Sequence, residues 1–260
     1  MRTWRIAVAA LISFGVIQTG SAQNLVPNPS FETFTACPAG LSDFYATSWS
    51  APTTGSPDYY NACAAPPTGV SVPTNSFGSQ AARTGVAYAG FIVRPTNDYR
   101  EYVQAQLTQP LLPGQIVQIE FWVSYPEGSR DAIDRIGAYL SVGAVGPIAN
   151  SSPLPLVPQV ESPAGVFLND ETSWMQVTGT YTAAGGETHI TLGNFRDNAS
   201  TNVQQNSGFY PGSYYYIDDV SVVVVGAAAG PAVPVLSRLG AALLAILMGA
   251  VGGLLLRRAS

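Results

Sequence analysis

Short runs of alternating apolar and polar residues constrain the fold of this chain most strongly. In the clearest run, 116–125, every second position is apolar: Val117, Ile119, Phe121 and Val123. Successive side chains of a β-strand point to opposite faces of the sheet, so these four residues predict a face that packs into a core. The positions between them are polar apart from one tryptophan, which predicts a second face outside that core.

The same pattern recurs along the chain, and Gly, Pro, Asn and Asp separate the runs. The other expected strands are 87–93, 100–107, 136–142, 174–182, 188–195 and 214–225. Between 24 and 225 there is no repeat and no apolar stripe of helical period. Many short strands separated by turn residues predict one all-β sandwich domain over 23–225, followed by a flexible linker over 226–233.

The charged residues exclude nucleic acid as a partner. They make up 10% of the chain, and all eleven basic residues are arginine. Six arginines and all sixteen acidic residues lie within 23–225, so the predicted domain has a net charge of −10. Binding to nucleic acid depends on clustered basic side chains, which this domain lacks. Neutral sugars and divalent cations are better suited to its charge.

Both ends of the chain carry targeting features. Residues 1–22 contain Arg2 and Arg5, then an apolar stretch and a small-residue end, which is the order of a secretory signal peptide. The alternative is an uncleaved anchor helix. Near the other end, 239–256 is an apolar run of 18 residues that predicts a transmembrane helix, with the arginines after it on the cytoplasmic side.

The C-terminal segment 234–260 resembles the Ile-Pro-Thr-Leu type of protein-sorting signal found in Gram-negative envelopes. The residues that carry the resemblance are Pro234, Ser237, Gly240, Arg257 and Arg258. Valine stands at 235, where that pattern has threonine. The resemblance implies export to the cell surface and a processing protease that cleaves near Pro234. The alternative is a permanent single-span anchor in the cell envelope.

The central domain resembles galactose-binding-like jelly rolls, the fold of many carbohydrate-binding modules, and in particular a lectin-like module beside OmpA-type and gliding-associated domains in bacterial surface proteins. The blocks that carry this resemblance are 24–32, 57–63, 83–90, 99–103, 133–139, 190–195 and 214–222. It implies a jelly-roll β-sandwich and a carbohydrate ligand, although one fold hosts many functions.

Cysteine and histidine are too scarce for most catalytic or metal chemistries. Cys37 and Cys63 are the only cysteines, and an exported chain folds in an oxidising compartment, which favours a disulfide over two free thiols. His189, the only histidine, lies in a predicted strand and is interpreted as a half-exposed sheet residue. A catalytic cysteine is therefore not expected.

Acidic residues suggest one cofactor, a structural Ca²⁺ ion. In several modules of the resembling fold, acids of the first and last strands hold this ion, which makes Glu32 and Asp219 the candidate ligands. The alternative is that both accept backbone hydrogen bonds at a strand end. A glycoside hydrolase would need two carboxylates in a cleft, and no local motif supports such a pair.

Two aromatic sets are candidate sugar-binding surfaces, since sugars stack on flat rings and hydrogen-bond to planar polar groups. The first set is expected on one sheet face and comprises Gln118, Glu120, Trp122, Tyr102, Gln104 and Tyr139. The second is expected in loops and comprises Tyr45, Trp49, Tyr59 and Tyr60. The alternatives are a second buried face under a loop for the first set, and an apolar plug held by the disulfide for the second.

Together these features predict an exported, envelope-anchored, non-catalytic module that binds carbohydrate or another envelope component. The runner-up is a structural or adhesive surface protein that binds protein partners. A glycoside hydrolase comes third.

Overall fold

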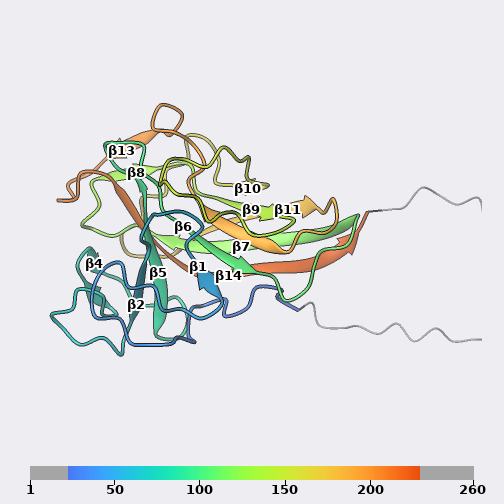
Figure 1. Ribbon diagram of the computed structural model, residues 1–260. Helices are drawn as coiled ribbons and strands as arrows, with labels where there is room; N and C mark the ends of the chain where they lie inside the picture. Colours follow the sequence, from blue (N-terminus) through green and yellow to red (C-terminus); the bar gives the residue numbers. More distant parts are fainter. Residues whose placement is uncertain (1–22, 229–260) are drawn as a thin grey trace, which may run out of the picture.

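The longest strand, β14 (Ser213–Ala227), lies at the centre of a five-stranded antiparallel sheet, called here the β14 sheet. The computed structural model describes residues 23–228 (Figure 1). The order of strands in the β14 sheet is β11 (Met175–Thr182), β7 (Gln115–Ser124), β14, β5 (Ala87–Arg94) and β2 (Asp58–Asn61).

A second five-stranded antiparallel sheet, the β12 sheet, packs against the first. Its order is β1 (Trp49–Ser50), β6 (Tyr102–Gln106), β12 (His189–Gly193), β9 (Gly137–Ser141) and β10 (Val160–Glu161). Two small antiparallel pairs lie outside these sheets: β3 (Thr74–Asn75) with β4 (Gly78–Ser79), and β8 (Asp131–Ile133) with β13 (Val203–Gln205).

The core lies between the two sheets, as the alternation predicts. Val117, Ile119, Phe121 and Val123 of β7 are fully buried there, in one cluster with apolar residues of the β12 sheet. The chain crosses from the β14 sheet at β5 to the β12 sheet at β6 and back at β7. The predicted all-β sandwich is confirmed, and these crossings are consistent with a jelly roll.

All seven predicted strands are present, with ends shifted by one or two residues at most positions. The strands that the sequence did not predict, among them β1, β3, β4 and β10, have two to four residues, too few for a visible alternation. The prediction of a linker from 226 is wrong at its first two residues. Gly226 and Ala227 still belong to β14, where they pair with Ile116 and Gln115.

The targeting predictions for 1–22 and 234–260, including the transmembrane helix over 239–256, lie outside the described residues. Within residues 23–228, no helix is long and apolar enough to cross a membrane.

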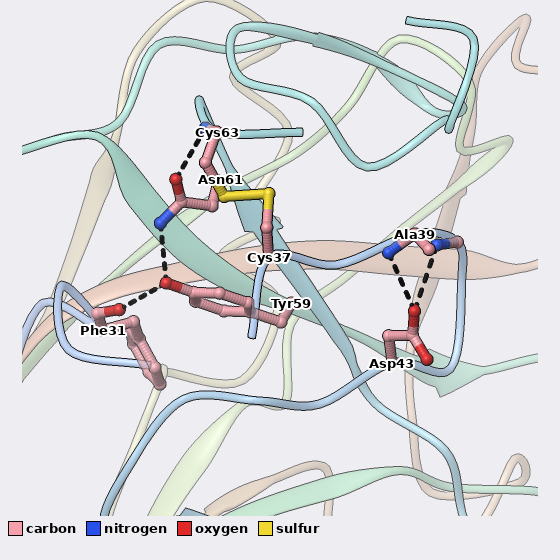
Figure 2. Close-up of a disulfide and its surroundings, with 8 residues drawn as sticks. Phe31, Cys37, Ala39, Asp43, Tyr59, Asn61 and Cys63 are labelled. Atoms are coloured by element: carbon pink, nitrogen blue, oxygen red, sulfur yellow. Dashed lines mark hydrogen bonds between the residues drawn. A yellow bond between two sulfur atoms is a disulfide. The ribbon is translucent and has the colours of Figure 1, made fainter. Parts of the chain in front are cut away.

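The predicted disulfide between Cys37 and Cys63 is present and ties the segment before β1 to the end of β2 (Figure 2). Hydrogen bonds fix its surroundings. Asn61 accepts a bond from the Cys63 amide (2.8 Å) and donates to the Tyr59 hydroxyl (2.7 Å), which itself donates to the Phe31 carbonyl (2.9 Å). The bridge thus holds a long irregular segment against the edge of the β14 sheet.

Replacing both cysteines by serine is expected to lower the free energy of unfolding by roughly 3 kcal/mol, because the bridge closes a loop over a sequence separation of 26 residues. Urea unfolding of the wild-type protein and the double variant measures the difference. Dithiothreitol should destabilise the wild type and leave the variant unchanged. Equal stability of the two oxidised proteins would contradict the prediction.

Candidate functional site

The first predicted aromatic set does not share one sheet face, so that prediction is wrong. Gln118, Glu120 and Trp122 lie on β7, on the outer face of the β14 sheet. Tyr102 on β6 and Tyr139 on β9 belong to the β12 sheet on the opposite side of the sandwich, as does Gln104. Alternation along a strand assigns a residue to a face but does not say which sheet that strand joins.

Neighbouring side chains contact both the ring face and the indole N–H of Trp122. The guanidinium carbon of Arg83 lies 3.7 Å from the centroid of its ring, and the indole N–H donates to Glu120 at 2.9 Å. The cation covers one face of the indole, an arrangement that stabilises surface aromatic rings. A sugar that stacked on this face would first have to displace Arg83.

On the β12 sheet, a loop covers the other three residues. Tyr102 is fully buried beneath Leu154, whose backbone N–H donates to the Tyr102 hydroxyl at 2.9 Å. Gln104 accepts from the Val145 amide at 2.7 Å and is also buried. Tyr139 lines an apolar pocket of about 450 Å³ formed with residues 141–145, Ile148 and 154–156. Tyr102, Gln104 and Tyr139 thus lie on a face under a loop, which was the alternative to a sugar-binding surface for the first set.

Three of the four residues of the second set are buried. Tyr59 and Tyr60 are in β2 and have no exposed surface, while Trp49 packs on Phe31 at 4.7 Å and donates from its indole to the Asn28 carbonyl. Tyr45 is half-buried and donates to Asp43. Tyr59 lies beside the disulfide (Figure 2), but Tyr60 points to the opposite face of the β14 sheet and packs on Tyr88 and Tyr216, so the four residues form neither one binding surface nor one apolar plug.

Glu32 and Asp219 both contact the turn at 83–87. Glu32 accepts from the amides of Val86 (2.9 Å) and Ala87 (3.1 Å), and Asp219 accepts from the Thr84 hydroxyl (2.6 Å) and from Arg83. Protein donors therefore already bind one oxygen of Glu32 and both oxygens of Asp219. Within residues 23–228, no group of three or more His, Cys, Asp or Glu side chains is placed to hold a metal. Calcium binding by Glu32 and Asp219 stays a prediction.

A different set of residues forms an open pocket at the β3–β4 hairpin. This hairpin pocket has a volume of about 450 Å³ and is lined by 74–79, Glu127, Gly128 and Phe209. The Phe209 side chain is 74% exposed, against 39% for Phe34, the other exposed phenylalanine of residues 23–228. The pocket lies within the size range of small-molecule sites.

The rings of the hairpin pocket belong to a continuous aromatic stack. Phe77 lies parallel to the buried Tyr214, with centroids 3.8 Å apart, and Phe209 lies on its outer side at 6.4 Å with the planes inclined by 19°. Backbone bonds hold Phe209 in place: the amide of Tyr210 donates to the Gly128 carbonyl at 2.8 Å. A Cβ at Gly128 would lie 2.6 Å from the Phe209 ring, so glycine permits this close approach.

Polar groups surround the two rings. Glu127 is exposed and accepts from the Ser79 amide at 3.1 Å through one carboxylate oxygen. Thr74, Ser76 and Ser79 add exposed hydroxyl groups. Apolar ring faces with a few hydroxyl and carboxylate groups at their edge match the chemistry of a sugar, whose apolar ring face is bordered by hydroxyls.

Solved structures similar to this chain include two carbohydrate-binding modules and an adhesin domain. The CBM22-1 xylan-binding domain from Paenibacillus barcinonensis Xyn10C is 15% identical, with 80% of this chain and 98% of that chain covered and a TM-score of 0.44. TmCBM61 in complex with beta-1,4-galactotriose is 17% identical, with 78% and 99% covered and a TM-score of 0.32. The K1 cleaved adhesin domain of Lys-gingipain from Porphyromonas gingivalis W83 is 15% identical, with 77% and 96% covered and a TM-score of 0.36.

No protein-family model and no curated protein matches the chain. Because one fold hosts many functions, the function of this chain depends on its own site residues.

The sequence analysis missed Phe77 and Phe209 as site residues. The sequence does mark both residues, since each is an aromatic residue within a turn of polar residues, glycine and proline. Phe77 lies in 75–79 and Phe209 lies in 206–212. Aromatic residues in such turns belong to no strand face. Only the fold shows that these two turns meet, although their phenylalanines are 132 residues apart in the sequence.

Three buried carboxyl groups have strongly altered acidities. Burial raises the pKa of Asp58 to about 6, of Glu101 to about 7 and of Asp218 to about 8. Each accepts hydrogen bonds within the domain: Asp58 from the Tyr214 hydroxyl (2.6 Å) and the Ser42 amide, Glu101 from the Ile92 amide (2.7 Å), and Asp218 from the Arg83 amide (2.9 Å). Asp58 therefore supports the aromatic stack of the hairpin pocket from inside the domain.

These pKa values predict a domain that loses stability as the pH rises. The folded state holds these three protons more tightly than the unfolded chain, whose carboxyl groups have pKa values near 4. The stabilisation is complete below pH 4 and is lost as the pH passes through about 6, 7 and 8.

Urea unfolding from pH 4.5 to 8.5 measures this loss, with buffer pH values chosen to bracket the folded-state pKa values. Glu101→Gln, which keeps an acceptor for the Ile92 amide, should flatten the curve near pH 7. A wild-type stability that increases over this interval would contradict the assignment.

Proposed function

We propose that this domain is a non-catalytic module that binds carbohydrate at the hairpin pocket. The observation that carries the proposal is an exposed aromatic side chain, Phe209, held parallel to Phe77 at the wall of an open polar-edged pocket. The apolar face of a sugar ring would pack on the phenyl rings. Its hydroxyls would donate to Glu127 and exchange hydrogen bonds with the hydroxyls of the hairpin.

A catalytic role is not supported by the carboxylates. Glycoside hydrolysis generally requires two of them flanking the scissile bond. The hairpin pocket has one, Glu127, and the apolar pocket at Tyr139 has none among its lining residues. Asp58 and Glu101 have the raised pKa of a general acid, but they are buried and hydrogen-bonded within the sandwich. Binding is therefore the proposed activity.

The wider setting of the module is also a proposal. We infer a galactose-binding-like jelly roll, exported by the signal peptide 1–22 and held in a Gram-negative cell envelope by the segment 234–260, in which a protease would cleave near Pro234. The resemblances in the sequence support this setting, and the disulfide agrees with an oxidising compartment. A surface location would expose the hairpin pocket to envelope or environmental glycans.

One observation favours the second candidate, an adhesive protein that binds protein partners. The apolar pocket at Tyr139 has no charged lining residue, and valines at or beside its rim, Val142 and Val157, are 75% and 73% exposed. Exposed apolar side chains at a pocket rim suit an apolar side chain of a partner. Pull-down from intact cells that survives excess free sugar would favour this function over the first.

Phe209→Ala is expected to reduce glycan binding at least tenfold while leaving the melting temperature nearly unchanged, because the ring is exposed and contributes little to the core. A glycan array identifies ligands, and isothermal titration measures the affinity of each variant for them.

Trp122→Ala is the matched control, since it removes an aromatic ring that does not line the hairpin pocket. Its glycan affinity should equal that of the wild type. If the tryptophan variant loses binding and the phenylalanine variant retains it, the ligand lies on the outer face of β7 and not in the hairpin pocket.

Mass spectrometry of the surface-located protein tests the proposed processing. The expected mature chain begins at Gln23 and ends near Pro234. An intact Ser260 in that material would exclude cleavage and leave a permanent anchor, and an intact Met1 would exclude removal of the signal peptide.

A further inference from the structure

A second, smaller pocket adjoins the hairpin pocket. This proline pocket has a volume of about 260 Å³ and is lined by Pro66, Pro67, Gly69, Ser71 and residues 74–76. Thr74, Asn75 and Ser76 line both pockets. Residues 74–76 therefore form a wall that the two pockets share.

The shared stretch is rigid. The Ser76 amide donates to the Gly69 carbonyl at 2.9 Å, and the Asn75 side chain donates to the Tyr88 hydroxyl at 2.9 Å. Asn75 also accepts from the Tyr216 hydroxyl at 2.6 Å, which ties the stretch to β14. A ligand that crosses from one pocket to the other meets a preformed surface, and preformed surfaces lower the entropic cost of binding.

The exposed groups suit a repeating ligand. Phe209 supplies an apolar wall in the hairpin pocket, and the exposed rings of Pro66 and Pro67 supply one in the proline pocket. The hydroxyls of Thr74 and Ser76 lie between them and are exposed. Along this surface an apolar wall, a polar stretch and a second apolar wall follow one another. The apolar ring faces and the hydroxyl groups of a polysaccharide alternate in the same way.

The charge of the two pockets limits the type of chain. Glu127 is the only charged side chain that lines either pocket, and no arginine lines them. A carboxylate repels the acid groups of a uronic acid polymer, and no cation is present to pair with them. An uncharged chain meets no such penalty.

We propose that the two pockets are adjoining subsites for one uncharged polysaccharide chain, which lies across residues 74–76. This inference rests on the proposed function and adds the length and charge of the ligand. A disaccharide would occupy the hairpin pocket alone, whereas a longer oligosaccharide would occupy both pockets.

Isothermal titration with xylo-, cello- and manno-oligosaccharides of two to six units tests the proposal, with oligogalacturonate as the charged series. In at least one neutral series, the affinity of the wild type should rise at least tenfold from two to six units. Oligogalacturonate should show no binding. A hexasaccharide that binds no more tightly than the disaccharide, or a preference for oligogalacturonate, would overturn the proposal.

Pro66→Ala and Phe209→Ala separate the subsites. Pro66→Ala removes an exposed ring from the proline pocket alone, so it should lower hexasaccharide affinity and leave disaccharide affinity unchanged. Phe209→Ala should lower both. Equal losses for both lengths in Pro66→Ala would overturn the two-subsite arrangement while leaving carbohydrate binding intact. If no neutral series binds to the wild type, the proposed function itself fails.

Discussion

The pairing of β14 with β7 and β5 is the interaction on which the rest of this domain depends. β14 runs through the centre of its sheet and is buried on both faces over its first half. Tyr215 and Ile217 face the core between the sheets, whereas Tyr214 and Tyr216 face outward and are also fully buried. Tyrosines on an outer face require a cover, because their rings are apolar and their hydroxyls need partners.

The segment that follows β2 provides this cover and thereby creates the proposed site. Asn75 accepts a hydrogen bond from Tyr216 and donates one to Tyr88, and Phe77 stacks on Tyr214. The β3–β4 hairpin is therefore fixed by the same tyrosines that it covers. Its two pockets are the outer surface of this cover, so the site is rigid although it is built from loops.

A bulge in β14 explains the arrangement of the acids near its centre. Asp218 pairs with Trp122 and Ser221 with Glu120, so one extra residue lies between them on β14. Asp219 has a φ of 48° there and directs its carboxylate to Arg83 and Thr84. Asp218 accepts from the amides of the same two residues. The adjacent acids thus bind one turn together, despite the strand alternation that would send them to opposite faces.

The sequence by itself determined the sandwich, its seven long strands, the core face of β7 and the pairing of the two cysteines. The sandwich, its strands and the core face follow from local alternation. The disulfide follows from the presence of only two cysteines in the sequence. Whether a residue that points out of the core is exposed depends on what covers it, and alternation carries no such information. The tertiary structure alone separated Trp122 from Tyr139, buried Tyr59 and Tyr60, and joined Phe77 to Phe209. Contacts between distant turns arise only when the sheets bring those turns to the same place, and for that reason the proposed site could not be derived from residue spacing.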